Sequence, residues 1–108
     1  MPKFESIPEL IAYYEARFLP EKAEGVDAVI QINLSDDQAI SFYVTIRDQT
    51  LRVDEGVHES PLLAITSTVK DWLRLNNGEA NPFTLMMRGK LKVEGPIQAV
   101  SKFQTMFA

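Results

Sequence analysis

The sequence predicts an α+β fold in which helices cover one face of a five-stranded, largely antiparallel sheet. Two patterns support this class. Apolar and polar residues alternate in consecutive segments joined by short turns, as in an antiparallel meander with one dry face. Segments with apolar residues at helical spacing precede and follow these strands, so the expected order is helix, three or four strands, two helices, strand, helix. We expect residues 1–108 to form a single domain of ordinary size.

The first helix is predicted from its start signal. Residues 6–9, Ser-Ile-Pro-Glu, form a capping box with proline in the first turn. Leu10, Tyr14 and Phe18 follow at helical spacing, and the helix should end near Pro20.

The strands are predicted from alternation. Residues 26–34 and 40–47 place apolar side chains at every second position, which puts residues such as Ile30 and Ile32 on the dry face. Turns are expected at residues 35–38 and 48–49. The expected third and fourth strands cover residues 51–53 and 63–65.

The second half of the chain is predicted to hold three helices and the fifth strand. Caps and turns give the boundaries: helix starts at Thr68 and Asn81, a helix stop at Gly89, a strand over residues 90–94 and a final amphipathic helix from residues 95–96.

Composition excludes several classes of function. The chain has 11 basic and 15 acidic residues, a formal charge of −4, which disfavours nucleic acid and strong electrostatic docking on anionic lipid. It has no cysteine, which excludes disulfides and thiol chemistry. No stretch approaches the ~20 apolar residues of a membrane span, and no secretory signal opens the chain. We therefore expect a cytoplasmic protein with at most transient membrane contact.

The last thirty residues are unusually rich in Phe and Met. Small proteins normally fill their interior with branched aliphatic residues that have well-defined rotamers. Phe and Met instead make a deformable, polarisable lining that accommodates guests of varying shape. This region therefore indicates binding of an apolar ligand rather than catalysis.

Catalytic alternatives find little support. His58 is the only histidine and lies near Asp54 and Glu55, but a metal site generally needs three or four convergent ligands. No G-x-S-x-G motif is present for a serine hydrolase, and the glycines are too far apart for a phosphate-binding loop. We predict no enzyme activity, no catalytic residue, no metal and no cofactor.

Two runs carry a resemblance to a known family. The run NGEANP at residues 77–82 and the run MMRGKLKVEG at residues 86–95 resemble the sterol carrier protein-2 (SCP2) family. That family shares a G-x-x-(D/N)-P opening, a small helix, a G-K-(L/I)-x-(V/I)-x-G strand and a closing helix. The likeness extends upstream to FLPEKA at residues 18–23, and departs from the family pattern at Pro96, which can still start a helix.

The resemblance implies a five-stranded sheet whose helices enclose an apolar tunnel for lipids such as fatty acids, acyl-CoA, sterols or isoprenoids. Because the chain lacks a terminal peroxisomal tripeptide, it is most similar to bacterial-type stand-alone members. We predict a non-catalytic lipid-binding and transfer protein. The predicted ligand-binding residues are Phe42, Val44, Trp72, Leu73, Phe83, Met86, Met87, Leu91, Phe103, Met106 and Phe107.

Several alternatives stay open. The same apolar side chains could simply form the core. Arg88 and Lys90 could hold a head group at a tunnel mouth or form an ordinary solvated turn, and the C-terminal helix, if its end is free, could act as a gate. A second candidate function is an accessory or scaffold protein of a lipid or ubiquinone-synthesis assembly, acting through a hydrophobic surface or as a homodimer.

Overall fold

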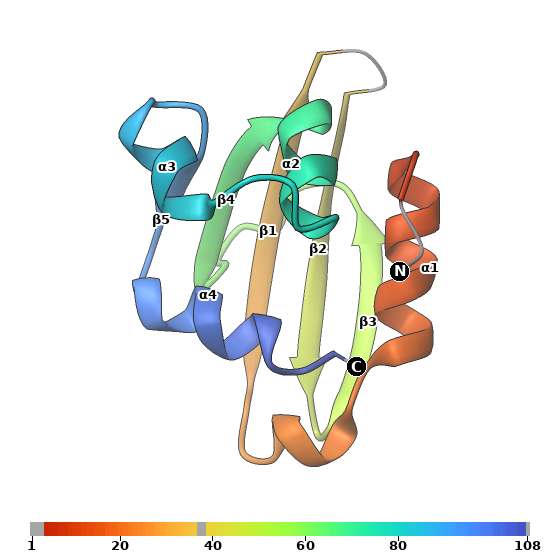
Figure 1. Ribbon diagram of the computed structural model, residues 1–108. Coiled ribbons are helices and arrows are strands. Elements are labelled where there is room, and N and C mark those ends of the chain that lie inside the picture. Colours follow the sequence, from red (N-terminus) through yellow and green to blue (C-terminus); the bar gives the residue numbers. More distant parts are fainter. Residues whose placement is uncertain (1–3, 37–38, 108) are drawn as a thin grey trace.

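Figure 1 shows the computed structural model of the chain, which describes residues 4–36 and 39–107. Its sheet has the strand order β3-β2-β1-β4-β5, and every neighbouring pair is antiparallel except β1 and β4. The predicted α+β class with a largely antiparallel sheet is confirmed. The elements in chain order are α1 (Ile7–Arg17), the 3₁₀ helix η1 (Pro20–Ala23), β1 (Ala28–Ser35), β2 (Ile40–Arg47), β3 (Thr50–Glu55), β4 (Leu63–Thr68), α2 (Val69–Asn76), α3 (Pro82–Met87), β5 (Lys92–Glu94) and α4 (Ile97–Gln104).

Helix α1 begins where its capping signal predicts. The Ser6 hydroxyl accepts a hydrogen bond from the Glu9 N–H at 3.3 Å, which satisfies one of the free donors of the first turn. The helix buries Leu10 and Tyr14, four residues apart on one face, and packs along β3. It ends at Arg17, slightly earlier than expected, because η1 starts at Pro20.

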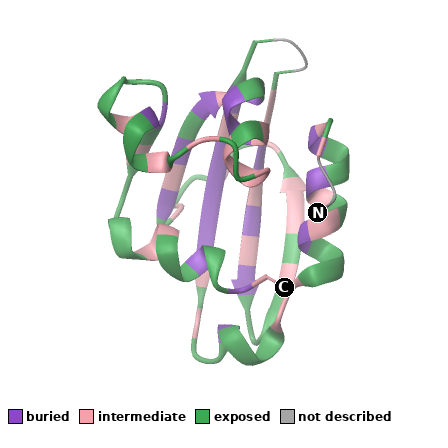
Figure 2. Ribbon diagram, in the orientation of Figure 1, coloured by how far each residue is buried: buried purple, intermediate pink, exposed green. Residues whose placement is uncertain are grey.

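The dry face of the sheet follows the predicted alternation. Ile32 lies opposite Phe42 on β2 and Ile65 on β4, and all three side chains are buried. Figure 2 shows burial concentrated along the central strands β1, β2 and β4, beneath the helices. Opposite residues in paired strands share a face, so this register gathers the apolar side chains into one core.

The connection from β3 to β4 covers part of the opposite face of the sheet. In crossing behind β2 and β1, this segment buries Gln31, which the alternation correctly places on the polar face. The Gln31 side-chain amide donates to the Phe42 and Gly56 carbonyls at 3.2 and 3.0 Å and accepts from the His58 N–H at 2.8 Å. These bonds satisfy a buried polar group and hold the connection against the sheet.

Side-chain caps start the next two helices as predicted. The Thr68 hydroxyl accepts from the Asp71 N–H at 3.0 Å, and the Asn81 side chain accepts from the Phe83 N–H at 2.8 Å. Gly89 ends α3 with a φ of 71°. None of the helices within residues 4–36 and 39–107 is long and apolar enough to cross a membrane.

Strand β5 is shorter than the predicted span of residues 90–94, because α3 closes through residues 89–91 before pairing starts. Gly95 follows β5 with a φ of 124°, and a Cβ at this position would collide with the Leu62 carbonyl oxygen. Only glycine therefore allows this close approach between the end of β5 and the start of β4. The predicted turn at residues 35–38 lies partly outside the described residues, since residues 37–38 are not described.

Candidate functional site

An apolar cavity of about 230 Å³ lies between the sheet and the helices. Its wall is mostly aromatic and aliphatic, with two amide side chains and no charged residue. The lining residues are Tyr13, Tyr14, Ile65, Trp72, Leu75, Asn76, Pro82, Leu91, Val93, Val100, Phe103, Gln104 and Phe107.

Helical periodicity explains which residues of α2 and α4 reach the cavity. Trp72, Leu75 and Asn76 are spaced three and four residues apart, so they lie on one side of α2. Val100, Phe103 and Phe107 repeat this spacing from α4 into the C-terminal segment. Ile65 and Val93 complete the wall as directly opposed residues of β4 and β5.

The polar groups inside the cavity are neutral. The Tyr14 hydroxyl donates to the Asn76 side-chain oxygen at 2.9 Å, and the Asn76 amide donates to the Trp72 carbonyl at 2.8 Å. Burial raises the pKa of Tyr14 far above its usual range, and the nearby Trp72 and Asn76 side chains only partly offset this effect. The buried indole N–H of Trp72 makes no well-aligned hydrogen bond with any described residue. The cavity therefore presents no charge to a guest at neutral pH.

The C-terminal segment is tied to the end of α1. The Leu19 N–H donates to the Met106 carbonyl at 2.7 Å, and Phe18 and Phe107 form an isolated antiparallel bridge. The Phe107 ring lies 4.9 Å from the Tyr14 ring between centroids, within stacking range. Aromatic and backbone contacts therefore hold Met106 and Phe107 against α1 and the segment that follows it.

The predicted ligand-binding residues fall into three groups. Four of them line the cavity: Trp72, Leu91, Phe103 and Phe107. Five contribute to the hydrophobic core without lining the cavity: Phe42, Val44 and Met106, which are fully buried, and Leu73 and Met86, which are partly buried.

The third group, Phe83 and Met87, lies on the surface, with exposed fractions of 63% and 89%. Helix α3 is anchored instead by Leu85, which is 5% exposed. Residues two positions apart in a helix point in nearly opposite directions, so Phe83 and Met87 project away from the interior when Leu85 points inward. The structure therefore places Phe83 and Met87 outside the cavity, whereas their selection as ligand-binding residues rested on residue type without helical phase.

Helical phase would also have identified cavity-lining residues that were not predicted from the sequence. Leu75 and Asn76 follow Trp72 at helical spacing, whereas the predicted Leu73 lies about 100° away around α2. Val100 and Gln104 share the side of α4 that carries Phe103. Pro82 had no comparable signal, because its place at the cavity depends on where α3 packs.

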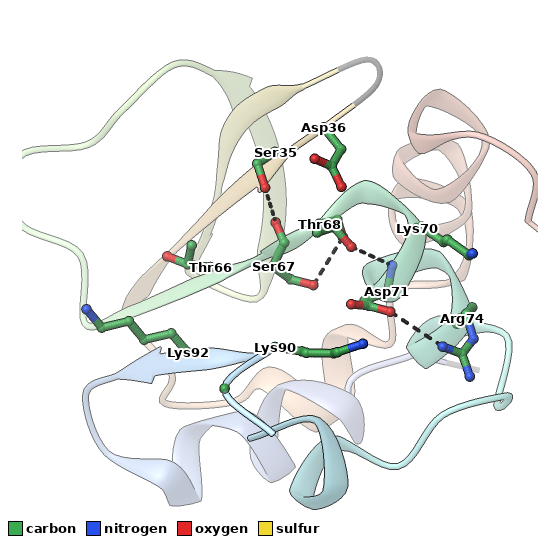
Figure 3. A pocket seen from close by; sticks show the side chains of 11 residues that line it. Ser35, Asp36, Thr66, Ser67, Thr68, Lys70, Asp71, Arg74, Lys90 and Lys92 are labelled. Carbon is green, nitrogen blue, oxygen red and sulfur yellow. Dashed lines mark hydrogen bonds and ion pairs between the residues drawn. The ribbon is translucent and has the colours of Figure 1, made fainter. Parts of the chain in front are cut away.

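A second hollow, of about 580 Å³, lies beyond the carboxyl ends of β1 and β4, the parallel pair of the sheet (Figure 3). Its wall is polar and basic: the lining residues are Ser35, Asp36, Thr66, Ser67, Thr68, Lys70, Asp71, Arg74, Gly89, Lys90 and Lys92. Four basic and two acidic side chains line it, and covering these charges with an alkyl chain would be costly. The smaller apolar cavity is therefore the better lipid site.

His58 has a structural role. Its Nδ1 accepts from the Ser60 N–H at 3.0 Å, and its ring packs 5.2 Å from the ring of Tyr43. Across the described part of the chain, no group of three His, Asp or Glu side chains is arranged to hold a metal ion.

The fold and the cavity define a class: an α+β protein with an uncharged hollow between a sheet and its covering helices. Sequence comparison identifies the family within this class. The chain belongs to the SCP-2 sterol transfer family, which matches residues 11–108. No curated protein sequence matches the chain significantly.

Solved structures share the fold. A double mutant of the sec-alkyl sulfatase PisA1, an enzyme of Pseudomonas sp., matches with a TM-score of 0.85 at 16% identity, covering 94% of this chain but 16% of that one. Sterol carrier protein 2 like 2 from Aedes aegypti matches with a TM-score of 0.68 at 19% identity, covering 94% of this chain and 95% of that one. The ubiquinone synthesis protein UbiJ-SCP2 matches with a TM-score of 0.71 at 12% identity, covering 92% and 90%.

Proposed function

We propose that the chain is a non-catalytic lipid carrier that holds an alkyl or isoprenoid tail in the cavity between the sheet and α1, α2 and α4. The observation that carries this proposal is a cavity wall rich in aromatic residues and free of charge, in a member of the SCP-2 sterol transfer family. The structure of sterol carrier protein 2 like 2 from Aedes aegypti in a palmitated form supports it, with a TM-score of 0.65 at 21% identity.

The size of the cavity limits how the ligand is held. A volume of about 230 Å³ is below the roughly 300–1,000 Å³ of most small-molecule sites. A long tail therefore needs α3 or α4 to shift outward. Burying about eight methylenes contributes roughly 6 kcal/mol, so a partly enclosed tail already offsets much of the cost of association.

The uncharged wall also decides which end of a lipid enters. Burying an ionised head group without a charged partner is very costly. Tails and neutral polar groups can enter the cavity, where the Asn76 and Gln104 amides offer hydrogen bonds. A carboxylate or phosphate head stays at the mouth or in solvent.

The test is a titration of the delipidated protein with a fluorescent fatty acid. We expect saturable binding in the micromolar range or tighter. The variant Val100→Asp places a charge on the cavity wall and should weaken binding by about tenfold or more, since 1.4 kcal/mol corresponds to tenfold. Gln98→Asp puts the same charge on the exposed side of α4 and should bind like the parent. Absence of saturable binding to the parent protein would exclude the carrier function.

The second candidate function, an accessory protein of a lipid or ubiquinone-synthesis assembly, is favoured by the structural similarity to UbiJ-SCP2. Here the cavity would present an apolar intermediate to a partner enzyme, or the surface would form a homodimer. Native mass spectrometry of gently purified protein separates the two functions. A retained lipid mass supports the carrier, whereas a lipid-free dimer or hetero-complex supports the accessory protein.

A further inference from the structure

Charge is unevenly distributed along this acidic chain. Residues 69–92 contain five basic and two acidic residues, a formal charge of +3. The rest of the chain contains six basic and thirteen acidic residues, a formal charge of −7. Although the net charge is −4, the chain therefore contains a positive region that runs from α2 through α3 to β5. Local charge, rather than net charge, governs contact with a surface at distances below a Debye length of about 8 Å.

Helix α3 presents apolar side chains to solvent within this positive region. Phe83 and Met87 lie one helical turn apart and are 63% and 89% exposed. The helix is held in place by buried Leu85 and by the Asn81 cap. Because the backbone is fixed at both points, the two apolar side chains are kept outward rather than free to fold into the core.

Two basic residues, Arg88 and Lys90, follow these apolar residues closely in the chain. Thr84 and Arg88 form the neighbouring exposed row on α3, and Lys90 follows one residue after the Gly89 turn. Arg88 and Lys90 line a hollow with Arg74 of α2, in which Glu79 is the one acidic lining residue. We call Phe83, Met87, Arg88, Lys90 and Arg74 the α3 face.

The wider set of cations is spread out rather than convergent. Figure 3 shows Lys92 on one side of the polar hollow and Lys70 and Arg74 on the other, with Lys90 between them. Arg74 already contacts the Asp71 carboxylate at 3.5 Å, and Lys92 contacts Glu94 at 3.3 Å. A site for one phosphate needs donors aimed at a single point. Dispersed cations beside exposed apolar side chains instead match an extended layer of anionic head groups.

We propose that the α3 face docks on anionic lipid bilayers, with Phe83 and Met87 inserted among the head groups and Arg88, Lys90 and Arg74 near the phosphates. The docking concerns the outside of α3 and does not require the cavity to hold lipid. It would also place the cavity at the bilayer, because Pro82 lines the cavity and immediately precedes Phe83.

The test is co-sedimentation of the full chain with vesicles of phosphatidylcholine alone and of phosphatidylcholine containing phosphatidylglycerol. We expect partition onto the anionic vesicles only, falling as salt is added. The double variant Arg88→Gln/Lys90→Gln should reduce partition by roughly 25-fold, about fivefold for each cation. The double variant Phe83→Gln/Met87→Gln should reduce it by roughly tenfold, through loss of apolar insertion.

Matched controls lie elsewhere on the surface. Val57→Gln removes an apolar side chain that is 74% exposed on the β3–β4 connection, and Arg17→Gln/Lys22→Gln removes two exposed cations near the end of α1. Both should bind vesicles like the parent. Equal binding to neutral and anionic vesicles, or equal losses in the controls, would overturn the proposal. It would also be overturned if Phe83→Gln/Met87→Gln left vesicle binding intact and only converted a dimer to a monomer.

The outcome is separable from that of the carrier proposal. All four substituted side chains of the α3 face lie outside the cavity, so these variants should bind a soluble fluorescent fatty acid like the parent. A protein that binds the fatty acid but no vesicle keeps the carrier function and loses the docking face. A protein that binds vesicles but no fatty acid keeps the docking face and loses the carrier function.

Discussion

The two hollows of this protein share walls but differ in chemistry. On helix α2, Trp72 and Leu75 line the uncharged cavity. Asp71 and Arg74 of the same helix line the polar hollow. The segment from residue 89 to 93 divides in the same way: Leu91 and Val93 line the apolar cavity, whereas Lys90 and Lys92 line the polar hollow. Periodicities of 3.6 and 2 residues thus separate charge from apolar surface across a wall one element thick. In the two proposals above, the lipid tail and the anionic bilayer would therefore contact neighbouring residues of the same segments.

The largest effect on stability should come from placing a charge on the side of this wall that faces the apolar cavity. Leu91 is 5% exposed, so Leu91→Asp buries an unpaired carboxylate and should lower the free energy of unfolding by about 3–5 kcal/mol. The same change one residue earlier, Lys90→Asp, lies in solvent and should alter it by less than about 0.5 kcal/mol. Urea unfolding measures both. Similar losses for the two variants would show that the wall does not separate the environments.

A smaller effect concerns the neutral interior and appears as a dependence on pH. Burial raises the pKa of Tyr14, so at high pH the unfolded chain ionises this phenol while the folded protein keeps it neutral. The associated stability is fully present below about pH 10 and is lost above it, by up to about 1.4 kcal/mol per pH unit. Tyr14→Phe should remove this part of the pH dependence.

The measurement is urea unfolding of the parent and of Tyr14→Phe at about pH 8 and about pH 11, on either side of the usual tyrosine pKa. At the lower pH the variant should be less stable by about 1 kcal/mol, because the hydrogen bond to Asn76 is lost. Parallel pH profiles for the two proteins would contradict a buried, neutral Tyr14.

The smallest effect is expected on the basic side of the wall. Arg74 is about half exposed, and its contact with the mostly buried Asp71 is long, at 3.5 Å, so Arg74→Gln should lower the free energy of unfolding by about 1 kcal/mol. The difference should shrink in high salt. Arg52→Gln, which removes a pair with Asp54 on β3, is a matched control and should cost no more. A loss of several kcal/mol for Arg74→Gln would mean that the polar hollow depends on this pair for its shape.

Local signals in the sequence predicted most of the fold. The caps at Ser6, Thr68 and Asn81 act where they were expected, and Gly89 adopts the left-handed conformation that ends α3. These features involve neighbours within four residues, which a sequence displays directly.

The candidate site was predicted less completely. Trp72, Leu91, Phe103 and Phe107 line the cavity, but Phe83 and Met87 face solvent.

The amino-acid sequence by itself determined the type and order of the elements, the dry face of the sheet and the apolar character of several side chains that line the cavity. Only the tertiary structure decided which apolar side chains border a cavity, because that depends on the rotation of each short helix against the sheet. It also decided the burial of Gln31, through a connection that begins more than twenty residues later in the chain. Residue type sets the free energy that a side chain contributes when it is buried, whereas long-range packing decides which side chains are buried.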